Sequence, residues 1–195
     1  MDTSHFYIDL GLNHVLDLNA LDHIYFLIAL ATPFALKTIK ELIIRVTFFT
    51  VGHSLALLLN NLYEIPVDYK WIEFLIPTTI ALTCIPLILQ SRSSNSVNNY
   101  RGLMSLLTII FGVIHGFGFA NYFYQIEKEN LNLINLLEFA IGIELAQIII
   151  VFIVILINLI FIKYLGFSSK KWQIIVGGII LTLSSTMVYD NLFFN

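Results

Sequence analysis

Imidazole and carboxylate side chains recur inside the most apolar stretches of this 195-residue sequence. Asp22 and His23 are adjacent, His53 lies in Thr-Val-Gly-His-Ser, and His115 lies in Phe-Gly-Val-Ile-His-Gly-Phe-Gly-Phe-Ala. Glu144 follows in Gly-Ile-Glu-Leu-Ala-Gln. Because an ionisable group inside a membrane costs several kcal/mol, each needs a partner or a function. Imidazole with carboxylate suits zinc, nickel, copper or iron better than magnesium or calcium, so these residues predict a transition-metal site.

The candidate metal ligands share an imidazole or a carboxylate: His14, Asp22, His23, His53, His115 and Glu144. The residues expected to support them are polar and lie in the same stretches: Thr50, Glu138 and Gln147. Asp22 could bind the ion or fix the tautomer of the neighbouring imidazole. If the chain is an enzyme, the candidate catalytic residues are Asp22, Glu144 and Ser54. Ser54 is a weak nucleophile candidate, because the adjacent His53 points about 100° away from it on a helix.

The elements that position these residues must have most of their outer surface in contact with lipid. Hydrophobic residues make up 58% of the chain and charged residues 12%, against roughly 45–50% and about 25% in soluble domains. A helix of about 20 apolar residues crosses the ~30 Å hydrocarbon layer. Six stretches qualify, which predicts an all-α, polytopic transmembrane bundle forming a single domain over residues 1–195: 16–36, 42–62, 71–90, 102–124, 133–162 and 172–193. A seventh, partial element over 6–20 is compatible with this pattern.

The loops between the predicted spans differ in charge. Eight of the ten Lys and Arg residues fall after spans one, three and five, in 37–45, 91–101 and 163–171. The positive-inside tendency makes these loops cytoplasmic, so both termini are expected to be extracytoplasmic. The net charge of −3 and the absence of a concentrated basic face exclude a nucleic-acid partner. The expected partners are membrane lipids and a metal ion, and the oligomeric state stays open.

The ionisable residues share one depth in the predicted bilayer. At a rise of 1.5 Å per residue, His53 lies ~15 Å below the outer end of its span, and His115 lies ~14 Å below. Glu144 lies ~17 Å and His23 about 10 Å below theirs. One buried histidine is usually a hydrogen-bonded packing residue, but several at matched depth favour a shared site in the outer half of the bilayer.

Four ordered motifs resemble the HupE/UreJ family of small bacterial membrane proteins: Gly11-Leu-Asn-His14 with Leu21-Asp22-His23, Phe49-Thr-Val-Gly-His53-Ser54, Phe111-Gly-Val-Ile-His115-Gly-Phe-Gly-Phe-Ala120, and Gly142-Ile-Glu144-Leu-Ala-Gln147. That family is associated with hydrogenase and urease gene clusters, and its members are regarded as nickel permeases. The resemblance implies a multi-pass protein of the bacterial inner membrane. It gives the six candidate ligands as the polar signature of the family, with Gln147 as a companion. Ala140 stands where family members often have Asn.

Two functions agree with these residues. A permease for a divalent transition metal, nickel or zinc, would capture the ion in the outer half and pass it inward, although Thr47 and Gln147 are nearly the only polar groups of the inner half. An intramembrane zinc-dependent hydrolase would hold zinc on three histidines and use a carboxylate as base, with its site open to the extracytoplasmic side. An assembly factor without a bound ion would not explain the clustering.

Overall fold

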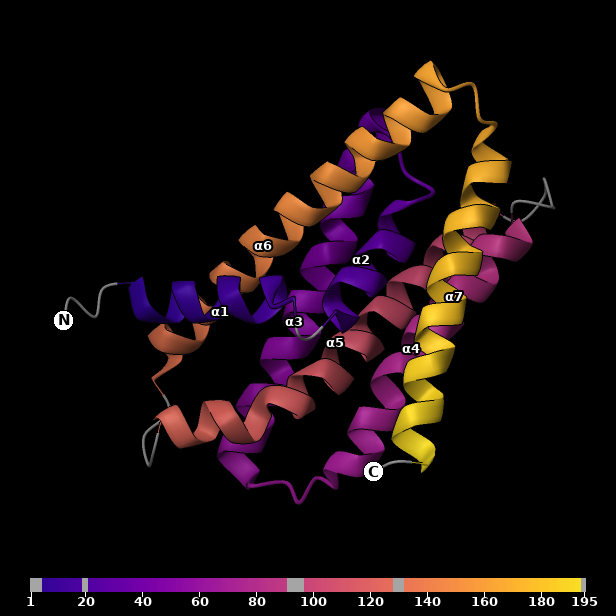
Figure 1. Cartoon of the computed structure of the whole chain (residues 1–195). Coiled ribbons are helices and arrows are strands. Elements are labelled where there is room, and N and C mark those ends of the chain that lie inside the picture. The colour runs from indigo at the N-terminus through magenta and orange to yellow at the C-terminus, as the bar shows by residue number, and fades with distance from the viewer. Residues whose placement is uncertain (1–4, 19–20, 91–96, 128–131, 194–195) are drawn as a thin grey trace.

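The computed structural model describes residues 5–18, 21–90, 97–127 and 132–193, and all regular elements in these ranges are helical. The α-helices are α1 (Phe6–Leu16), α2 (Asp22–Ala31), α3 (Ile39–Tyr63), α4 (Tyr69–Gln90), α5 (Val97–Glu127), α6 (Leu133–Leu159) and α7 (Ser169–Phe193). A 3-10 turn, η2 (Leu36–Thr38), precedes α3, and a π-helical turn, η3 (Ile160–Tyr164), follows α6. The predicted all-α class is confirmed (Figure 1). Arg92 of the predicted basic loop lies outside the described ranges.

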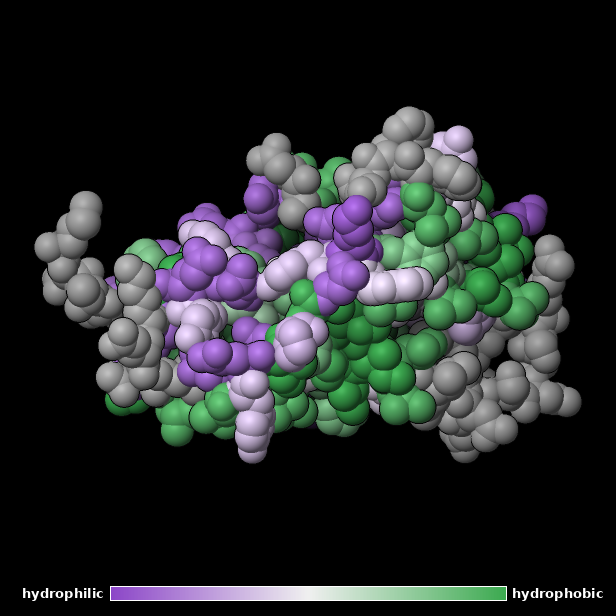
Figure 2. Space-filling view, turned by 90° about the horizontal axis from the view of Figure 1, so that it is seen from below, coloured by the Kyte–Doolittle hydropathy of each residue, from purple (hydrophilic) through white to green (hydrophobic). Residues whose placement is uncertain are grey.

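Five helical segments in the described ranges are long and apolar enough to cross a membrane: Leu36–Tyr63, Tyr69–Leu89, Ser105–Glu127, Leu133–Tyr164 and Ser169–Leu192. They correspond to the last five predicted spans, and the protein is a multi-pass membrane protein. Large apolar side chains lie exposed along these helices, as at Leu55, Leu89, Ile153 and Ile179. Seen from below, hydrophobic residues also cover much of the surface beside a hydrophilic region on the left and centre (Figure 2).

The first predicted span, 16–36, is not one continuous helix. The chain forms the partial N-terminal helix α1, leaves helical geometry at Asp17, and starts again with α2. The ten residues of α2 extend about 15 Å, half of the hydrocarbon layer. Pro33 follows Thr32 and disfavours continuation of the helix, while the Thr32 hydroxyl donates to the carbonyl of Ile28 at 2.6 Å.

Two side-chain hydrogen bonds between helix ends mark the two ends of the bundle. At one end, named the Glu64 end, the Tyr124 hydroxyl donates to Glu64 at 2.9 Å, which joins the end of α5 to the end of α3. The opposite end, named the Gly166 end, contains the turn between η3 and α7. There the Asn158 amide donates to the carbonyl of Thr32 at 3.2 Å, which joins α6 to the end of α2.

Helices α1 and α2 together run from near the Glu64 end of the bundle towards the Gly166 end. The Tyr7 ring lies 6.3 Å from that of Phe123 near the end of α5, whereas α2 ends beside Asn158. In Figure 1 α1 lies across α6, and α2 continues towards the start of α3. The break between Leu16 and Asp22 therefore lies within the bundle, between its two ends.

Glycines bring two pairs of helices into backbone contact. A Cβ added to Gly112 of α5 would lie 2.3 Å from the carbonyl oxygen of Phe49 in α3, and one added to Gly116 would lie 2.4 Å from that of His53. A Cβ added to Gly142 of α6 would lie 2.2 Å from the carbonyl oxygen of Ile8 in α1. Gly112 and Gly116 therefore pack α5 against α3, and Gly142 packs α6 against α1.

Candidate metal centre

Four histidines from four helices gather within the bundle. The ring of His14 in α1 lies 4.7 Å from that of His23 in α2 and 5.4 Å from that of His53 in α3, measured between centroids. The ring of His115 in α5 lies 4.5 Å from that of His23. His23, His53 and His115 are at most 3% exposed. His14, one of the predicted ligands, belongs to the same cluster.

Asp22 contacts two of these imidazoles at once. Its Oδ1 lies 3.1 Å from Nδ1 of His23, and its Oδ2 lies 3.2 Å from Nε2 of His115. An ionised carboxylate only accepts hydrogen bonds, so both nitrogens carry the proton in these contacts. The backbone N–H of His23 also donates to Oδ1 at 2.8 Å. Asp22 therefore orients two rings and fixes their tautomers.

Four other imidazole nitrogens are buried and have no hydrogen-bond partner among the described residues. They are Nε2 of His14, Nε2 of His23 and both nitrogens of His53. A buried polar atom without a partner costs about 1–3 kcal/mol, so such a concentration calls for an explanation. A metal ion would satisfy several of these atoms together.

Two overlapping groups of ligand atoms lie close enough together to hold a metal ion after small side-chain movements. One consists of His14, His23 and His53, and the other of Asp22, His23 and His115, and within each group the ligand atoms lie within 4.8 Å of one another. His23 belongs to both groups. His53 and His115, which we expected to share one ion with His23, fall into different groups. In the described residues Glu144 and Glu138 belong to neither.

Aromatic rings enclose the histidines. The ring of His14 lies 4.1 Å from that of Phe119 in α5, and the ring of His115 lies 4.1 Å from that of Phe111. The ring of His53 lies 5.9 Å from those of Phe49 and Phe139. These rings were not predicted as part of the site, although Phe111 and Phe119 flank His115 in its sequence motif. They surround the imidazoles with apolar groups, which strengthens electrostatic interactions inside the cluster.

A second polar group lies between α3 and α6 on the Gly166 side of His53. The Thr47 hydroxyl donates to Oε1 of Glu144 at 2.6 Å, and the Thr50 hydroxyl donates to its Oε2. Thr50 also lies 3.0 Å from Oε1 of the fully buried Gln147, whose Nε2 has no partner in the described part. Thr50 and His53 are three residues apart on α3 and share one face, so this polar group continues from the histidine cluster.

The other predicted site residues lie apart from the cluster. Glu138 is half-buried and near enough to Tyr7 for an electrostatic interaction. Ser54 is half-buried, and its hydroxyl has no hydrogen-bond partner within the described ranges. Arg45, assigned to a loop from its charge, lies in α3 instead, where it is buried with its guanidinium 4.9 Å from the centre of the Phe34 ring.

A family model described as "HupE / UreJ protein" matches residues 1–190. No curated protein matches, and no solved structure matches. Since the matched region covers nearly the whole chain, the protein belongs to the HupE/UreJ family.

Proposed function

We propose that this HupE/UreJ protein is a permease for a divalent transition metal, nickel in the first place, and that His14, His23 and His53 capture the ion. The observation that carries the proposal is the convergence of their ligand atoms, within 4.8 Å of one another, from three different helices. Imidazole is a preferred ligand for nickel and zinc. The link of the family to metal transport supports transport rather than storage.

The capture site is assigned to the three-histidine group because of its free nitrogens. Nδ1 of His23 and Nε2 of His115 already contact Asp22, whereas Nε2 of His14, Nε2 of His23 and both nitrogens of His53 have no partner among the residues described. An ion bound to these nitrogens would leave the contacts of Asp22 intact. Asp22 then acts through His23, as the carboxylate behind many metal-bound histidines does.

The polar group between α3 and α6 provides the next contacts on the way inward. An ion that leaves the imidazole nitrogens needs replacement ligands. In this polar group the atoms that contact one another are all oxygens, from Thr47, Thr50, Glu144 and Gln147. These oxygens bind a transition metal more weakly than imidazole does. A second site that binds the ion more weakly favours transport, because the ion must also be able to leave the protein.

The break between α1 and α2 supports a transport architecture. We infer that these two helices together form a sixth, discontinuous crossing, which would place both termini on the same side. Many transporters bind their substrates where a helix is interrupted near the midplane, and here His14 and His23 flank the interruption. The Gly166 end carries Lys37, Lys163 and Lys170, so the positive-inside tendency makes it cytoplasmic in the bacterial inner membrane.

The alternative function, an intramembrane zinc-dependent hydrolase, has less support in the geometry. It needs a carboxylate beside the ion to activate water. Asp22 is held by two imidazoles, and Glu144 by two threonine hydroxyls. The Ser54 hydroxyl has no hydrogen-bond partner among the described residues, and Ser54 lies in neither ligand group. These contacts favour a conducting path over a catalytic centre.

Metal uptake into proteoliposomes tests the proposal. Wild-type protein should accumulate Ni²⁺ or Zn²⁺ faster than empty liposomes, and His53→Ala should abolish the difference. Gln147→Leu should slow uptake without removing metal binding, since it changes only the second site, between α3 and α6. His5→Ala is the matched control, because His5 is exposed and outside the cluster, and it should transport as the wild type does.

The same preparation distinguishes the two functions. If wild-type protein binds metal but transports it no faster than empty liposomes do, the permease proposal fails and the hydrolase becomes the better account. If Gln147→Leu transports normally while His53→Ala does not, the capture site stands and the proposed inward route is wrong.

A further inference from the structure

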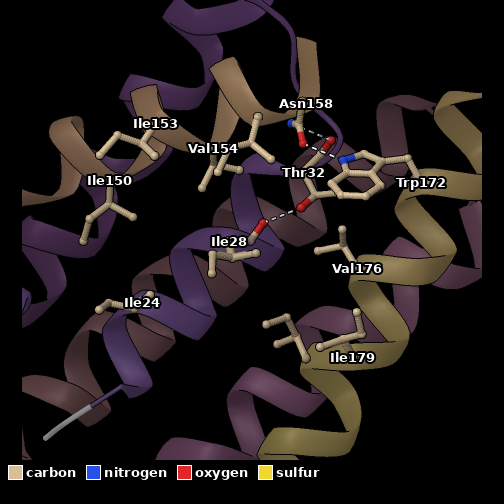
Figure 3. A pocket seen from close by; sticks show the side chains of 12 residues that line it. Ile24, Ile28, Thr32, Ile150, Ile153, Val154, Asn158, Trp172, Val176 and Ile179 are labelled. Atoms are coloured by element: carbon tan, nitrogen blue, oxygen red, sulfur yellow. Dashed lines mark hydrogen bonds between the residues drawn. The ribbon is translucent and has the colours of Figure 1, made fainter. Parts of the chain in front are cut away.

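A groove lies between α2, α6 and α7, apart from the histidine cluster. Its volume is about 430 Å³, and nine of its twelve lining residues are isoleucine or valine. Figure 3 shows Ile24 and Ile28 of α2 facing Val176 and Ile179 of α7, with α6 along a third side. Most of this lining offers water no hydrogen-bond partner, so the groove favours an apolar occupant.

The groove is open to the surface along one side. Its floor includes Val154 and Ile180, which are buried, while Ile153, Ile157 and Ile179 at the rim are exposed. In a membrane-spanning protein this rim faces the hydrocarbon chains of the bilayer. The apolar groups that are always available to enter are therefore lipid acyl chains.

The polar groups of the groove are already paired with one another. The indole N–H of Trp172 donates to Oδ1 of Asn158 at 2.7 Å, and Nδ2 of Asn158 donates to the carbonyl of Thr32 at 3.2 Å (Figure 3). The Thr32 hydroxyl donates to the carbonyl of Ile28. None of these side chains needs a polar group from a ligand, so the occupant of the groove itself is a hydrocarbon chain.

Positive charge marks the end of the groove where the headgroup would lie. Lys170 and Lys171 directly precede Trp172 in the first turn of α7, and both are exposed. Lys163 lines a smaller cavity of about 110 Å³ that shares Asn158 with the groove. Between Glu144 and Asp190 the sequence has these three lysines and no Asp, Glu or Arg. Basic pockets between transmembrane helices favour anionic headgroups.

We propose that the groove binds an anionic phospholipid from the leaflet at the Gly166 end, with an acyl chain between α2, α6 and α7 and the phosphate near Lys170 and Lys171. The lipid contacts Ile24 and Ile28, so it also stabilises the position of α2, the helix that carries Asp22 and His23. This assignment stands without the proposed transport activity, because it rests on the groove and on the lysines alone.

Native mass spectrometry of detergent-purified protein tests the assignment. Phosphatidylglycerol and phosphatidylcholine with identical acyl chains are added in equal amounts, and retained lipid is counted. Wild-type protein should retain phosphatidylglycerol preferentially. Removing a lysine should weaken this retention about fivefold for each charge lost, so Lys170→Gln with Lys171→Gln should nearly abolish the preference. The matched control, Lys37→Gln with Lys40→Gln, removes two lysines that do not line the groove and should keep it.

Filling the groove provides the second measurement. Ile179→Trp places a large side chain at the rim and should reduce retention of both lipids, whereas Ile175→Trp, one turn earlier on α7 and outside the groove, should not. Equal retention of the two lipids by wild-type protein, or full retention by Ile179→Trp, overturns the assignment. It is also overturned if the protein is a lipid-free dimer that Ile179→Trp converts to monomer, since a second copy would then occupy the groove.

Discussion

Replacing Asp22 by asparagine tests how the histidine cluster holds its ion. Oδ1 of Asp22 accepts from Nδ1 of His23 at 3.1 Å, and Oδ2 accepts from Nε2 of His115 at 3.2 Å. Asparagine keeps one acceptor oxygen and replaces the other by an amide that donates. With the present tautomers, therefore, at most one of the two contacts can survive, and the carboxylate charge is lost.

The expected magnitude depends on where the ion lies. If His14, His23 and His53 bind it, Asp22 acts only by orienting His23, and loss of such a carboxylate lowers metal affinity about 10- to 100-fold, or about 1.4 to 2.7 kcal/mol. If the ion lies in the group of Asp22, His23 and His115, the substitution removes a ligand and should cost more. The unpaired nitrogens of His14 and His53 favour the smaller loss.

Isothermal titration of purified protein with Ni²⁺ measures the difference. Asp22→Asn should bind about 10- to 100-fold more weakly than wild type, and His14→Ala and His53→Ala should show no measurable binding. His115→Gln should lose about tenfold or less, because it removes a partner of Asp22 and not a ligand. His5→Ala, outside the cluster, should bind as the wild type does.

Two results would refute this reasoning. If His115→Gln abolishes binding while His14→Ala retains it, the ion lies in the other group, and the unpaired nitrogens were a wrong guide. If Asp22→Asn binds with wild-type affinity, its contacts with the two imidazoles do not orient ligands at all. A stability check by thermal unfolding in detergent separates either result from loss of the fold.

Three further predictions concern the fold that holds the cluster. A reporter active only in the cytoplasm should give no signal when fused after Asn195 and a strong signal when inserted at Gly166, because the basic loops lie at the latter end; the reverse pattern would contradict the proposed orientation. Gly116→Ala should destabilise the protein by about 1–3 kcal/mol because it overpacks the contact of α3 with α5, while Gly178→Ala, where an added Cβ meets nothing within 4 Å, should be neutral in thermal unfolding. Asn158→Leu removes the amide that joins α2, α6 and α7, and should lower stability by about 1–3 kcal/mol, measured in the same assay.

The sequence predicted the long helices well, because a span needs an uninterrupted apolar stretch and little else. It failed at 16–36, where mean apolarity resembled that of a span. The chain is not helical at Asp17, where the backbone is extended, and α2 ends before Pro33, which disfavours its continuation. Composition over a window averages such features away. The partial N-terminal element was compatible with the sequence, but its position across α6 depends on Gly11 and Gly142, which no single-helix pattern reveals.

That the histidines lie close together was predictable from residue type and depth, whereas their grouping was not. The depth of a residue along its helix does not indicate which neighbouring helix its side chain contacts. His53 and Glu144 were expected at one level, but Glu144 lies against the threonines of α3, and His53 lies against His14. The polar amide of Asn158 was visible within the apolar α6 segment, yet its role required knowledge of Trp172 and of the end of α2.

The four histidines depend on two different kinds of support. His53 and His115 lie on long helices whose backbones touch at Gly112 and Gly116, so their relative position is fixed by main-chain contact. His14 and His23 lie on short helices on either side of a break, and each short helix is held in place by a contact outside the histidine cluster. Gly11 packs α1 against α6, and Asn158 binds the end of α2. The geometry of the cluster, and with it the affinity for an ion, therefore depends on packing at Gly11 and Asn158 as well as on the imidazoles.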